Sequence, residues 1–284
     1  MDDQIAVAFA VFAVLFMAAV SDWRKREASD LHWLIIMGIG AVLFGIRVHD
    51  ADLSPMCYLS VVSMVLMAAD LLWDRDTDNR IDLALYFLII VSVVVSAFAM
   101  RDDDLLWTYL SIPAMYLLMN FLYYSGAVKG GADAKALISI AFAYPSYPVF
   151  GSIPFIGIPG DDAVYFIVPA FSVFLFAALF TVLLVIPYAV TNIVRGDISF
   201  PEMFAGYRMD IGRAEKAQVW PMDDVVNGQI ISSVSGVEDE SVFERLHAAG
   251  AERIWVTPVI PFLIPITAAF AVVMFLGNPL LLLI

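Results

Sequence analysis

The sequence predicts an all-α polytopic membrane protein with about eight transmembrane helices and a small α+β subdomain. Hydrophobic residues make up 62% of the 284 residues, and the mean hydropathy is +0.86. Several uncharged runs approach the roughly 20 residues that a helix needs to cross the hydrocarbon core of a bilayer. One long polar stretch, 195–253, interrupts these runs near the C-terminus. A lipid bilayer is therefore the expected surrounding of most of the chain.

The apolar runs predict the helices in chain order. They cover residues 4–20, 31–46, 55–73, 82–100, 105–124, 136–143, 163–190 and 258–282. Prolines remove backbone donors and break helices, so the sixth helix is expected to be short. An irregular, glycine-containing loop follows it, with prolines at Pro145, Pro148, Pro154 and Pro159. Pro169 and Pro187 are the positions at which the seventh helix can kink.

The polar stretch between the last two helices has the composition of a folded subdomain. Strand-like runs at 218–226 and 229–234 flank Asn227-Gly228, a strong signal for a β-hairpin. Residues 241–249 form an amphipathic helical pattern that Gly250 closes. The chain is accordingly divided into a membrane domain at 1–194, a cytoplasmic subdomain at 195–257 and a last transmembrane helix at 258–284.

The distribution of basic residues predicts the orientation. If the chain starts outside, all of its 15 Lys and Arg residues except Arg47 and Arg101 fall in inside loops. Because basic residues favour the cytoplasmic side, both termini are expected outside and the subdomain in the cytoplasm of a multi-pass plasma-membrane protein. Five tryptophans fall near the expected interfaces, as an aromatic belt would: Trp23, Trp33, Trp73, Trp107 and Trp255.

Composition also argues against several classes of partner and of structural site. The net charge of −14 and the pI near 4.4 argue against nucleic acid as a partner. The single cysteine, Cys57, excludes a disulfide framework and a zinc site built on several cysteines. The three histidines are scattered, so we expect neither a metal nor a cofactor. The acidic start of the chain lacks the basic region of a removable signal peptide, so the first apolar run is expected to be retained.

The polar island at residues 129–135, Lys-Gly-Gly-Ala-Asp-Ala-Lys, separates two apolar runs. Its glycines allow a tight backbone approach, and Asp133 stands where a helix would begin. Asp133 can simply cap that helix, and Asp22 can simply close the first helix. However, the predicted orientation puts both carboxylates on one membrane face. Two carboxylates that share a proton can activate water against a peptide bond, as in aspartyl proteases.

At these residues the chain resembles the archaeal prepilin and preflagellin (prearchaellin) peptidases, which are GxGD-type membrane aspartyl proteases. The resemblance lies in Ser21-Asp22-Trp23-Arg24, in residues 130–135 and in the stretch 252–266 that leads into the last helix. It implies that Asp22 and Asp133 are catalytic, with Gly130, Gly131, Ala132 and Lys135 forming the supporting loop. It further implies that the substrates are pilin-like or archaellin precursors, whose short, basic class III signal peptides are removed at the cytoplasmic membrane face.

The chain departs from the family pattern at two places. Ala132 replaces the second glycine of the G-x-G-D motif, which a negative φ at that position would allow. The segment 55–100 is an additional helix pair relative to the six-helix family pattern. Because the insertion contains two helices, it keeps Asp133 on the same side as Asp22. The cysteine-rich methyltransferase part of bacterial relatives has no counterpart here.

Three other interpretations remain open. A presenilin-like intramembrane protease shares the GxGD chemistry, but its Pro-Ala-Leu motif does not occur here. A secondary transporter also places aspartates near broken helices, although internal repeats are not evident. A non-catalytic membrane scaffold is the third. Asp70, deep in the predicted third helix, is interpreted as a paired or snorkelling residue near the interface rather than as a catalytic one.

Overall fold

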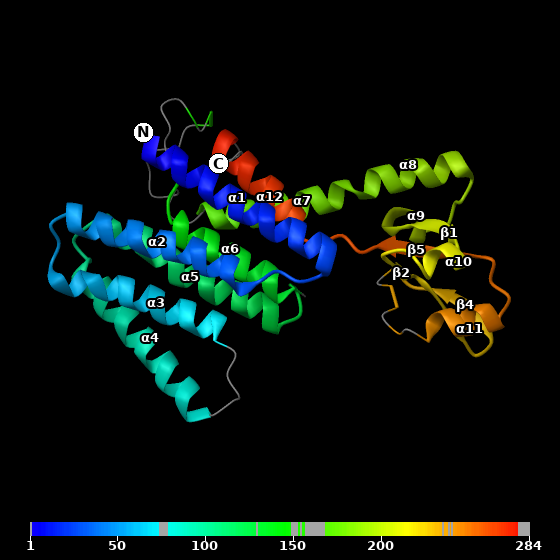
Figure 1. Ribbon diagram of the computed structural model, residues 1–284, viewed down its shortest axis with the longest axis horizontal. Helices are drawn as coiled ribbons and strands as arrows, with labels where there is room; N and C mark the ends of the chain where they lie inside the picture. The colour runs from blue at the N-terminus through cyan, green and yellow to red at the C-terminus, as the bar shows by residue number, and fades with distance from the viewer. Residues whose placement is uncertain are drawn as a thin grey trace. The chain divides into compact units, whose positions relative to one another are not determined.

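The structure is a computed structural model that describes residues 2–73, 79–128, 130–148, 153, 155–156, 168–234, 236–237, 239 and 241–277. The chain divides into two compact units (Figure 1). The first unit comprises residues 1–178 and 261–284, and the second unit comprises residues 179–260.

The first unit is helical. Its helices are α1 (Asp2–Lys25), α2 (Asp30–Asp50), the 3-10 helix η1 (Pro55–Tyr58) with α3 (Leu59–Leu72), α4 (Asn79–Ala99), α5 (Leu105–Tyr124), α6 (Gly131–Ala143) and α12 (Leu263–Leu276). Helix α7 (Pro169–Leu183) begins in this unit. Among the described residues six helical segments are long and apolar enough to cross a membrane, the last being Pro169–Arg195. The prediction of a helical polytopic membrane protein is confirmed, and the number of eight crossings stays a prediction.

Helix α6 is the central helix of the first unit. It packs against α1, α2, α5 and α12, and every side chain from 136 to 143 is buried. Its closest approach is to α2 at Gly40, where a Cβ would lie 2.7 Å from the backbone nitrogen of Ala143. Large apolar side chains on the outer helices point outward instead, as on α4 at Phe87, Val94 and Phe98. Such a surface suits lipid.

Three predicted helix boundaries were each wrong by five residues, and the second helix ends at Asp50 rather than at residue 46. Helix α1 continues past residue 20 to Lys25, because basic residues in its last turn suit the negative end of the helix dipole. Helix α6 begins at Gly131 rather than at residue 136. The last helix begins at Leu263, because residue 258 still belongs to strand β5 and Pro261 cannot supply a helical backbone donor.

The predicted seventh helix is two helices, α7 and α8 (Val185–Arg195). The break falls at Leu184, three residues before Pro187, whose ring and missing N–H disfavour a continuous helix. Residues 163–167, where the sequence predicted the start of this helix, lie outside the described residues.

The second unit contains the predicted α+β subdomain. After α8 it consists of α9 (Glu202–Ala205), β1 (Tyr207–Asp210), α10 (Ile211–Ala214), β2 (Val219–Pro221), β3 (Asp223–Val226), β4 (Gln229–Ser232), α11 (Val242–Ala248) and β5 (Arg253–Pro258). Strands β1, β5 and β2 form an antiparallel sheet with β5 in the middle, and β3 pairs with β4. Positive φ angles of 52° at Asn227 and 78° at Gly228 confirm the predicted hairpin turn. The predicted helix at 241–249 is confirmed as α11.

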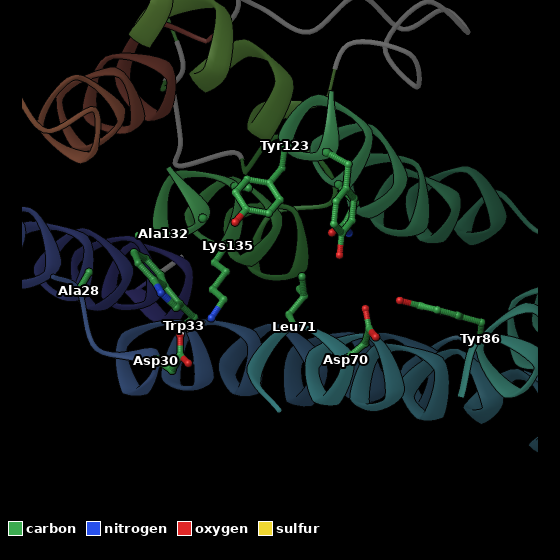
Figure 2. Close-up of a pocket in the computed structure, with 13 residues that line it drawn as sticks. Ala28, Asp30, Trp33, Asp70, Leu71, Tyr86, Tyr123, Ala132 and Lys135 are labelled. Carbon is green, nitrogen blue, oxygen red and sulfur yellow. Dashed lines mark hydrogen bonds and ion pairs between the residues drawn. The ribbon is translucent and has the colours of Figure 1, made fainter. Parts of the chain in front are cut away.

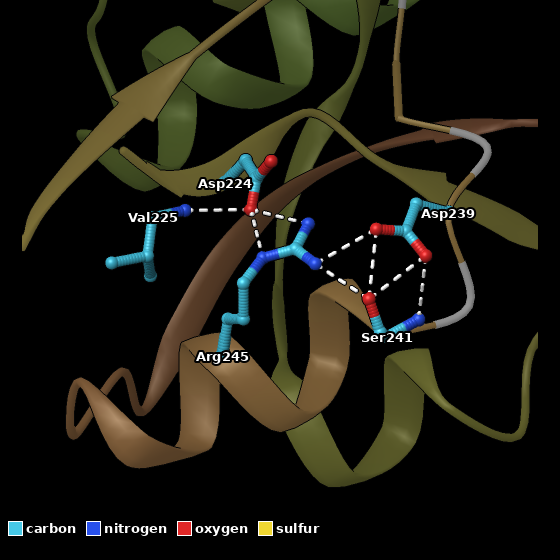
Figure 3. A network of polar contacts seen from close by, with 5 residues as sticks. All are labelled: Asp224, Val225, Asp239, Ser241 and Arg245. Atoms are coloured by element: carbon cyan, nitrogen blue, oxygen red, sulfur yellow. Dashed lines mark hydrogen bonds and ion pairs between the residues drawn. The ribbon is translucent and has the colours of Figure 1, made fainter. Parts of the chain in front are cut away.

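Arg245 connects α11 with β3 in this unit (Figure 3). Its Nε donates to Oδ1 of Asp224 at 2.9 Å, and its Nη1 donates to Oδ2 of Asp239 at 2.7 Å. The same Nη1 donates to Oγ of Ser241, the residue before the helix. Asp239 in turn accepts the backbone N–H of Ser241 at 3.0 Å. The network therefore holds the start of α11 on the β-hairpin.

Two of the five tryptophans assigned to an aromatic belt are instead buried. Trp255 lies in the middle strand β5 and is 2% exposed. Trp33, on α2, is fully buried within the first unit. The interfacial interpretation of these two residues was wrong, because proximity to a predicted helix end does not reveal which way a side chain faces.

Candidate active site

Asp22 lies in the last turn of α1 and is partly buried. Its backbone carbonyl accepts the N–H of Arg26 at 2.9 Å. Arg26 adopts the left-handed conformation, with φ of 59°, and so ends the helix. Ser21 fixes the same turn, because its hydroxyl donates to the backbone carbonyl of Glu27 at 2.9 Å. The Arg26 guanidinium also acts electrostatically on the Asp22 carboxylate.

Asp133 lies in the first turn of α6 and is the third residue of that helix. Gly130 precedes the helix, and its carbonyl accepts the N–H groups of Asp133 at 3.1 Å and Ala134 at 3.3 Å. The Asp133 side chain folds back over Gly130, so that its Oδ2 lies where a side chain on residue 130 would begin. Asp133 is thus not the residue that caps the helix, and a side chain at residue 130 would displace the Asp133 carboxylate from this position.

The structure places the two helices that carry the predicted carboxylates in contact. Helix α1 contacts α6, and Asp22 acts electrostatically on Asp133. Both residues are only partly exposed. Two carboxylates in such proximity disfavour double ionisation, and sharing one proton relieves the repulsion. Two carboxylates that interact in this way can divide the roles of acid and base between them, as general acid–base catalysis requires.

The other predicted loop residues, Gly131, Ala132 and Lys135, have different surroundings. A Cβ at Gly131 would lie 3.6 Å from the Tyr123 hydroxyl, which is an ordinary contact. Ala132 is helical, a conformation that an alanine adopts without strain. Lys135 forms an ion pair with Asp30 of α2, with 2.6 Å between Nζ and Oδ1. Lys129, the other basic residue of the island, lies outside the described residues.

A cavity of about 310 Å³ lies on the other side of the first turns of α6 (Figure 2). Helices α2 to α6 and the loop before α2 line it with Ala28, Asp30, Trp33, Asp70, Leu71, Tyr86, Asn120, Tyr123, Tyr124, Gly131, Ala132, Ala134 and Lys135. Asp70 of α3 accepts a hydrogen bond from the Tyr116 hydroxyl, which confirms that it is paired. Neither Asp22 nor Asp133 lines this cavity.

The sequence alone pointed to neither Trp33 nor Asp30 as part of this region. Ser29 caps α2, because its side chain accepts the N–H of Leu31. Asp30 follows it directly, and an acidic residue is common in the first turn of a helix. An acidic residue four positions from a lysine on the same helix would have predicted an ion pair. Lys135 and Asp30 are 105 residues apart, so the sequence gave no such signal. Among the described residues, no three His, Cys, Asp or Glu side chains form a group that could hold a metal ion.

The chain is similar to archaeal peptidases. Residues 199–278 match the family described as Archaeal Peptidase A24 C-terminus Type II. An uncharacterized protein of Methanocaldococcus jannaschii is 23% identical over 273 residues, which is 92% of this chain and 88% of that protein. The preflagellin peptidase of Methanococcus maripaludis is 22% identical over 78% of this chain and 95% of its own length. The preflagellin peptidase of M. jannaschii is 25% identical over 63% of this chain and 76% of its own length. These matches make the chain similar to the archaeal preflagellin peptidases.

Proposed function

We propose that this protein is a membrane aspartyl endopeptidase that removes class III signal peptides from preflagellin and other pilin-like precursors. The observation that carries this activity is the electrostatic interaction of Asp22 on α1 with Asp133 on α6, whose carboxylate lies over Gly130. The two relatives named preflagellin peptidase support a precursor of that kind as the substrate.

The reaction follows from the two carboxylates. The ionised aspartate accepts a proton from a water molecule, whose oxygen attacks the carbonyl carbon of the scissile peptide bond. The protonated aspartate donates its proton to the carbonyl oxygen, so that a neutral tetrahedral intermediate forms. When this intermediate collapses, the C–N bond breaks and the leaving amine takes a proton from the aspartate that received it from water. One hydroxyl of the intermediate returns its proton to the other aspartate as the carbonyl of the new carboxylic acid forms. Water is consumed, and both aspartates return to their starting state.

The reaction is expected at the cytoplasmic membrane surface. Asp22 lies one turn before the end of α1 and next to the basic residues Arg24, Lys25 and Arg26, which favour the cytoplasmic side. A site near a helix end is within reach of water, so the nucleophile does not have to enter the hydrocarbon core. The same location suits a substrate whose basic leader lies at the surface and whose apolar segment enters the bilayer.

The test is cleavage of a co-expressed pilin-like precursor, followed as a gel shift. Asp22→Asn and Asp133→Asn keep the size of each side chain and remove the proton-accepting oxygen, so each is expected to lower the rate by at least about 100-fold. Asp104→Asn is the matched control, because Asp104 is an exposed aspartate directly before the first residue of α5, whereas Asp133 follows the last residue of that helix. It should cleave at the wild-type rate.

Membrane insertion and thermal stability of each variant must match the wild type for this comparison. Cleavage that persists in Asp133→Asn would exclude Asp133 as a catalytic group. If the wild type cleaves no precursor of this class, the peptidase function itself is wrong, and the transporter and scaffold interpretations return.

A further inference from the structure

The second unit has a strip of exposed apolar side chains along α7 and α8. On the two helices the strip takes every fourth residue, which keeps it on one side, and it continues past the end of α8, through Val182, Ile186, Val190, Val194, Ile198 and Phe200. Val194 and Phe200 are 81% and 82% exposed, more than any other large apolar side chain in the described part of the chain. A row of exposed apolar side chains on a folded unit marks an interaction surface.

The opposite side of α8 is attached to the rest of the unit. Asn192 is fully buried, and its Nδ2 donates to the backbone carbonyls of Met203 at 2.8 Å and Gly206 at 2.7 Å. One turn earlier, the ring of Tyr188 lies 6.4 Å from the ring of Tyr207, measured between centroids. A rotation of α8 that buried the strip would expose Asn192 and break both of its hydrogen bonds. The strip is therefore fixed on the outer side of the helix.

The strip begins on a segment that is itself expected in lipid. Pro169–Arg195 is long and apolar enough to cross a membrane, and Val182 lies within it. At 1.5 Å per residue its 27 residues measure about 40 Å, whereas the hydrocarbon core is about 30 Å thick. A segment longer than the core is accommodated by tilting, which brings one side of its end against the lipid. The strip suits this side, because it runs without interruption from α7 onto α8 while protein covers the other side of α8.

The charges beside the strip suit a lipid surface. Residues 179–202 contain two carboxylates, and both are shielded from solvent. The Asp197 side chain is 9% exposed and pairs with Arg253, with 2.9 Å between Oδ2 and Nη2, and Glu202 is 8% exposed. The remaining charged residue of this range, Arg195, is exposed at the end of α8. In a protein with a net charge of −14, an apolar strip bordered by an exposed arginine and by no exposed carboxylate matches phosphate headgroups over acyl chains.

We propose that this strip binds the lipid of the membrane in which the protein is embedded. Val190, Val194, Ile198 and Phe200 enter the boundary between headgroups and acyl chains, and Arg195 meets the phosphate groups. Helix α8 is then an interfacial helix that holds the second unit at the lipid surface. The inference does not rest on the proposed peptidase function, because it involves no catalytic group and is tested without a substrate.

The depth of single positions in the bilayer can be measured. Val194→Cys and Phe200→Cys, each in the full-length protein, are labelled with a nitroxide and reconstituted into nanodiscs of phosphatidylcholine and phosphatidylglycerol. Oxygen concentrates in the hydrocarbon and a nickel chelate stays in water, so the ratio of their effects on nitroxide relaxation reports the depth of the label. The native Cys57 is buried, and wild-type protein treated with the label is the blank.

Two further positions are matched controls. Ile90→Cys, exposed near the middle of the span Arg80–Ala99, should give the high oxygen-to-nickel ratio of a residue that faces lipid. Ala249→Cys, exposed on the same unit as the strip and directly after α11, should give the low ratio of a residue in water. Residues 194 and 200 should lie between these two, at a depth of about 5–10 Å below the lipid surface.

Either of two results would overturn the inference. A ratio at residues 194 and 200 equal to that at residue 249 would mean that the strip lies in water. A label that neither reagent reaches would mean that protein covers the strip, and dipolar broadening of its spectrum would identify a second copy of the chain. Each labelled protein must keep the thermal unfolding midpoint of the wild type, and Ile198→Cys replaces either position whose label lowers it.

Discussion

The carboxylate of Asp133 occupies the space in which a side chain on Gly130 would lie. Because Asp133 is the third residue of α6, its side chain can turn back over the residue before the helix. A side chain at residue 130 and the present position of the Asp133 carboxylate therefore exclude one another. Gly131 has no such neighbour, since a Cβ there meets only the Tyr123 side chain at ordinary contact distances.

This asymmetry predicts opposite results for two adjacent substitutions. Gly130→Ala should displace the Asp133 carboxylate and lower the cleavage rate of a precursor about 100-fold, since misplacement by about 1 Å is sufficient for such a loss. Gly131→Ala should retain most activity. The measurement is the single-turnover cleavage rate of both variants in the same membranes. Equal rates for the two variants would show that residue 130 does not position the carboxylate.

The fold itself depends on a second close approach, between Gly40 and the C-terminal turn of α6. A Cβ at Gly40 would collide with the backbone at Phe142 and Ala143, so Gly40→Ala must separate α2 from α6. We expect a loss of roughly 1–3 kcal/mol in stability, as is typical of overpacking. Gly38→Ala, two residues earlier on the same helix, has no atom within 4 Å of the new Cβ.

The thermal unfolding midpoint in detergent distinguishes these variants. Gly38→Ala should match or exceed the wild type, because alanine is the better helix former. Gly40→Ala should unfold at a lower temperature. If both midpoints move together, the contact between α2 and α6 is not what limits stability.

The orientation of the chain in the membrane can be tested with single introduced cysteines. The one native cysteine, Cys57, is buried and should not react. Ala249→Cys places a thiol on the exposed end of α11, and Asp102→Cys places one in the exposed loop between α4 and α5. A membrane-impermeant maleimide should label residue 102 in intact cells and residue 249 only in inside-out vesicles, as the positive-inside rule predicts. The reverse pattern would put the subdomain outside.

Local signals in the sequence were sufficient for most elements. The helix at 105–124 and the hairpin at Asn227-Gly228 were predicted correctly, because hydrophobic runs and turn residues act over a few positions. The distribution of basic residues predicted that Asp22 and Asp133 share one membrane face, and the family resemblance implied that they are the catalytic pair. Spacing says nothing about which helices pack together, and the cavity around Trp33 joins five helices. The start of α6 was missed because its first turn contains Gly131 and Asp133, which are poor helix formers.

The Arg245 network predicts how the second unit responds to pH. Hydrogen bonds from Arg245 and Ser241 lower the pKa of Asp239 from 3.8 to about 2. A carboxylate whose pKa is depressed in the folded state stabilises that state at pH values above its unfolded pKa. This contribution should therefore be fully present above pH 4 and should be lost as the pH falls from 3.8 to about 2. Arg245→Gln removes it at every pH.

Hydrogen exchange of α11, normalised to an unstructured reference peptide, measures this effect. At neutral pH α11 should exchange faster in Arg245→Gln than in the wild type, because its connection to Asp224 and Asp239 is lost. Near pH 2 the difference should shrink, since the Asp239 part of the connection is then lost in both proteins. Arg213→Gln, which removes an exposed charge from α10, should follow the wild type. A difference between Arg245→Gln and wild type that is the same at pH 6 and pH 2 would mean that Asp239 does not contribute to holding α11 in place.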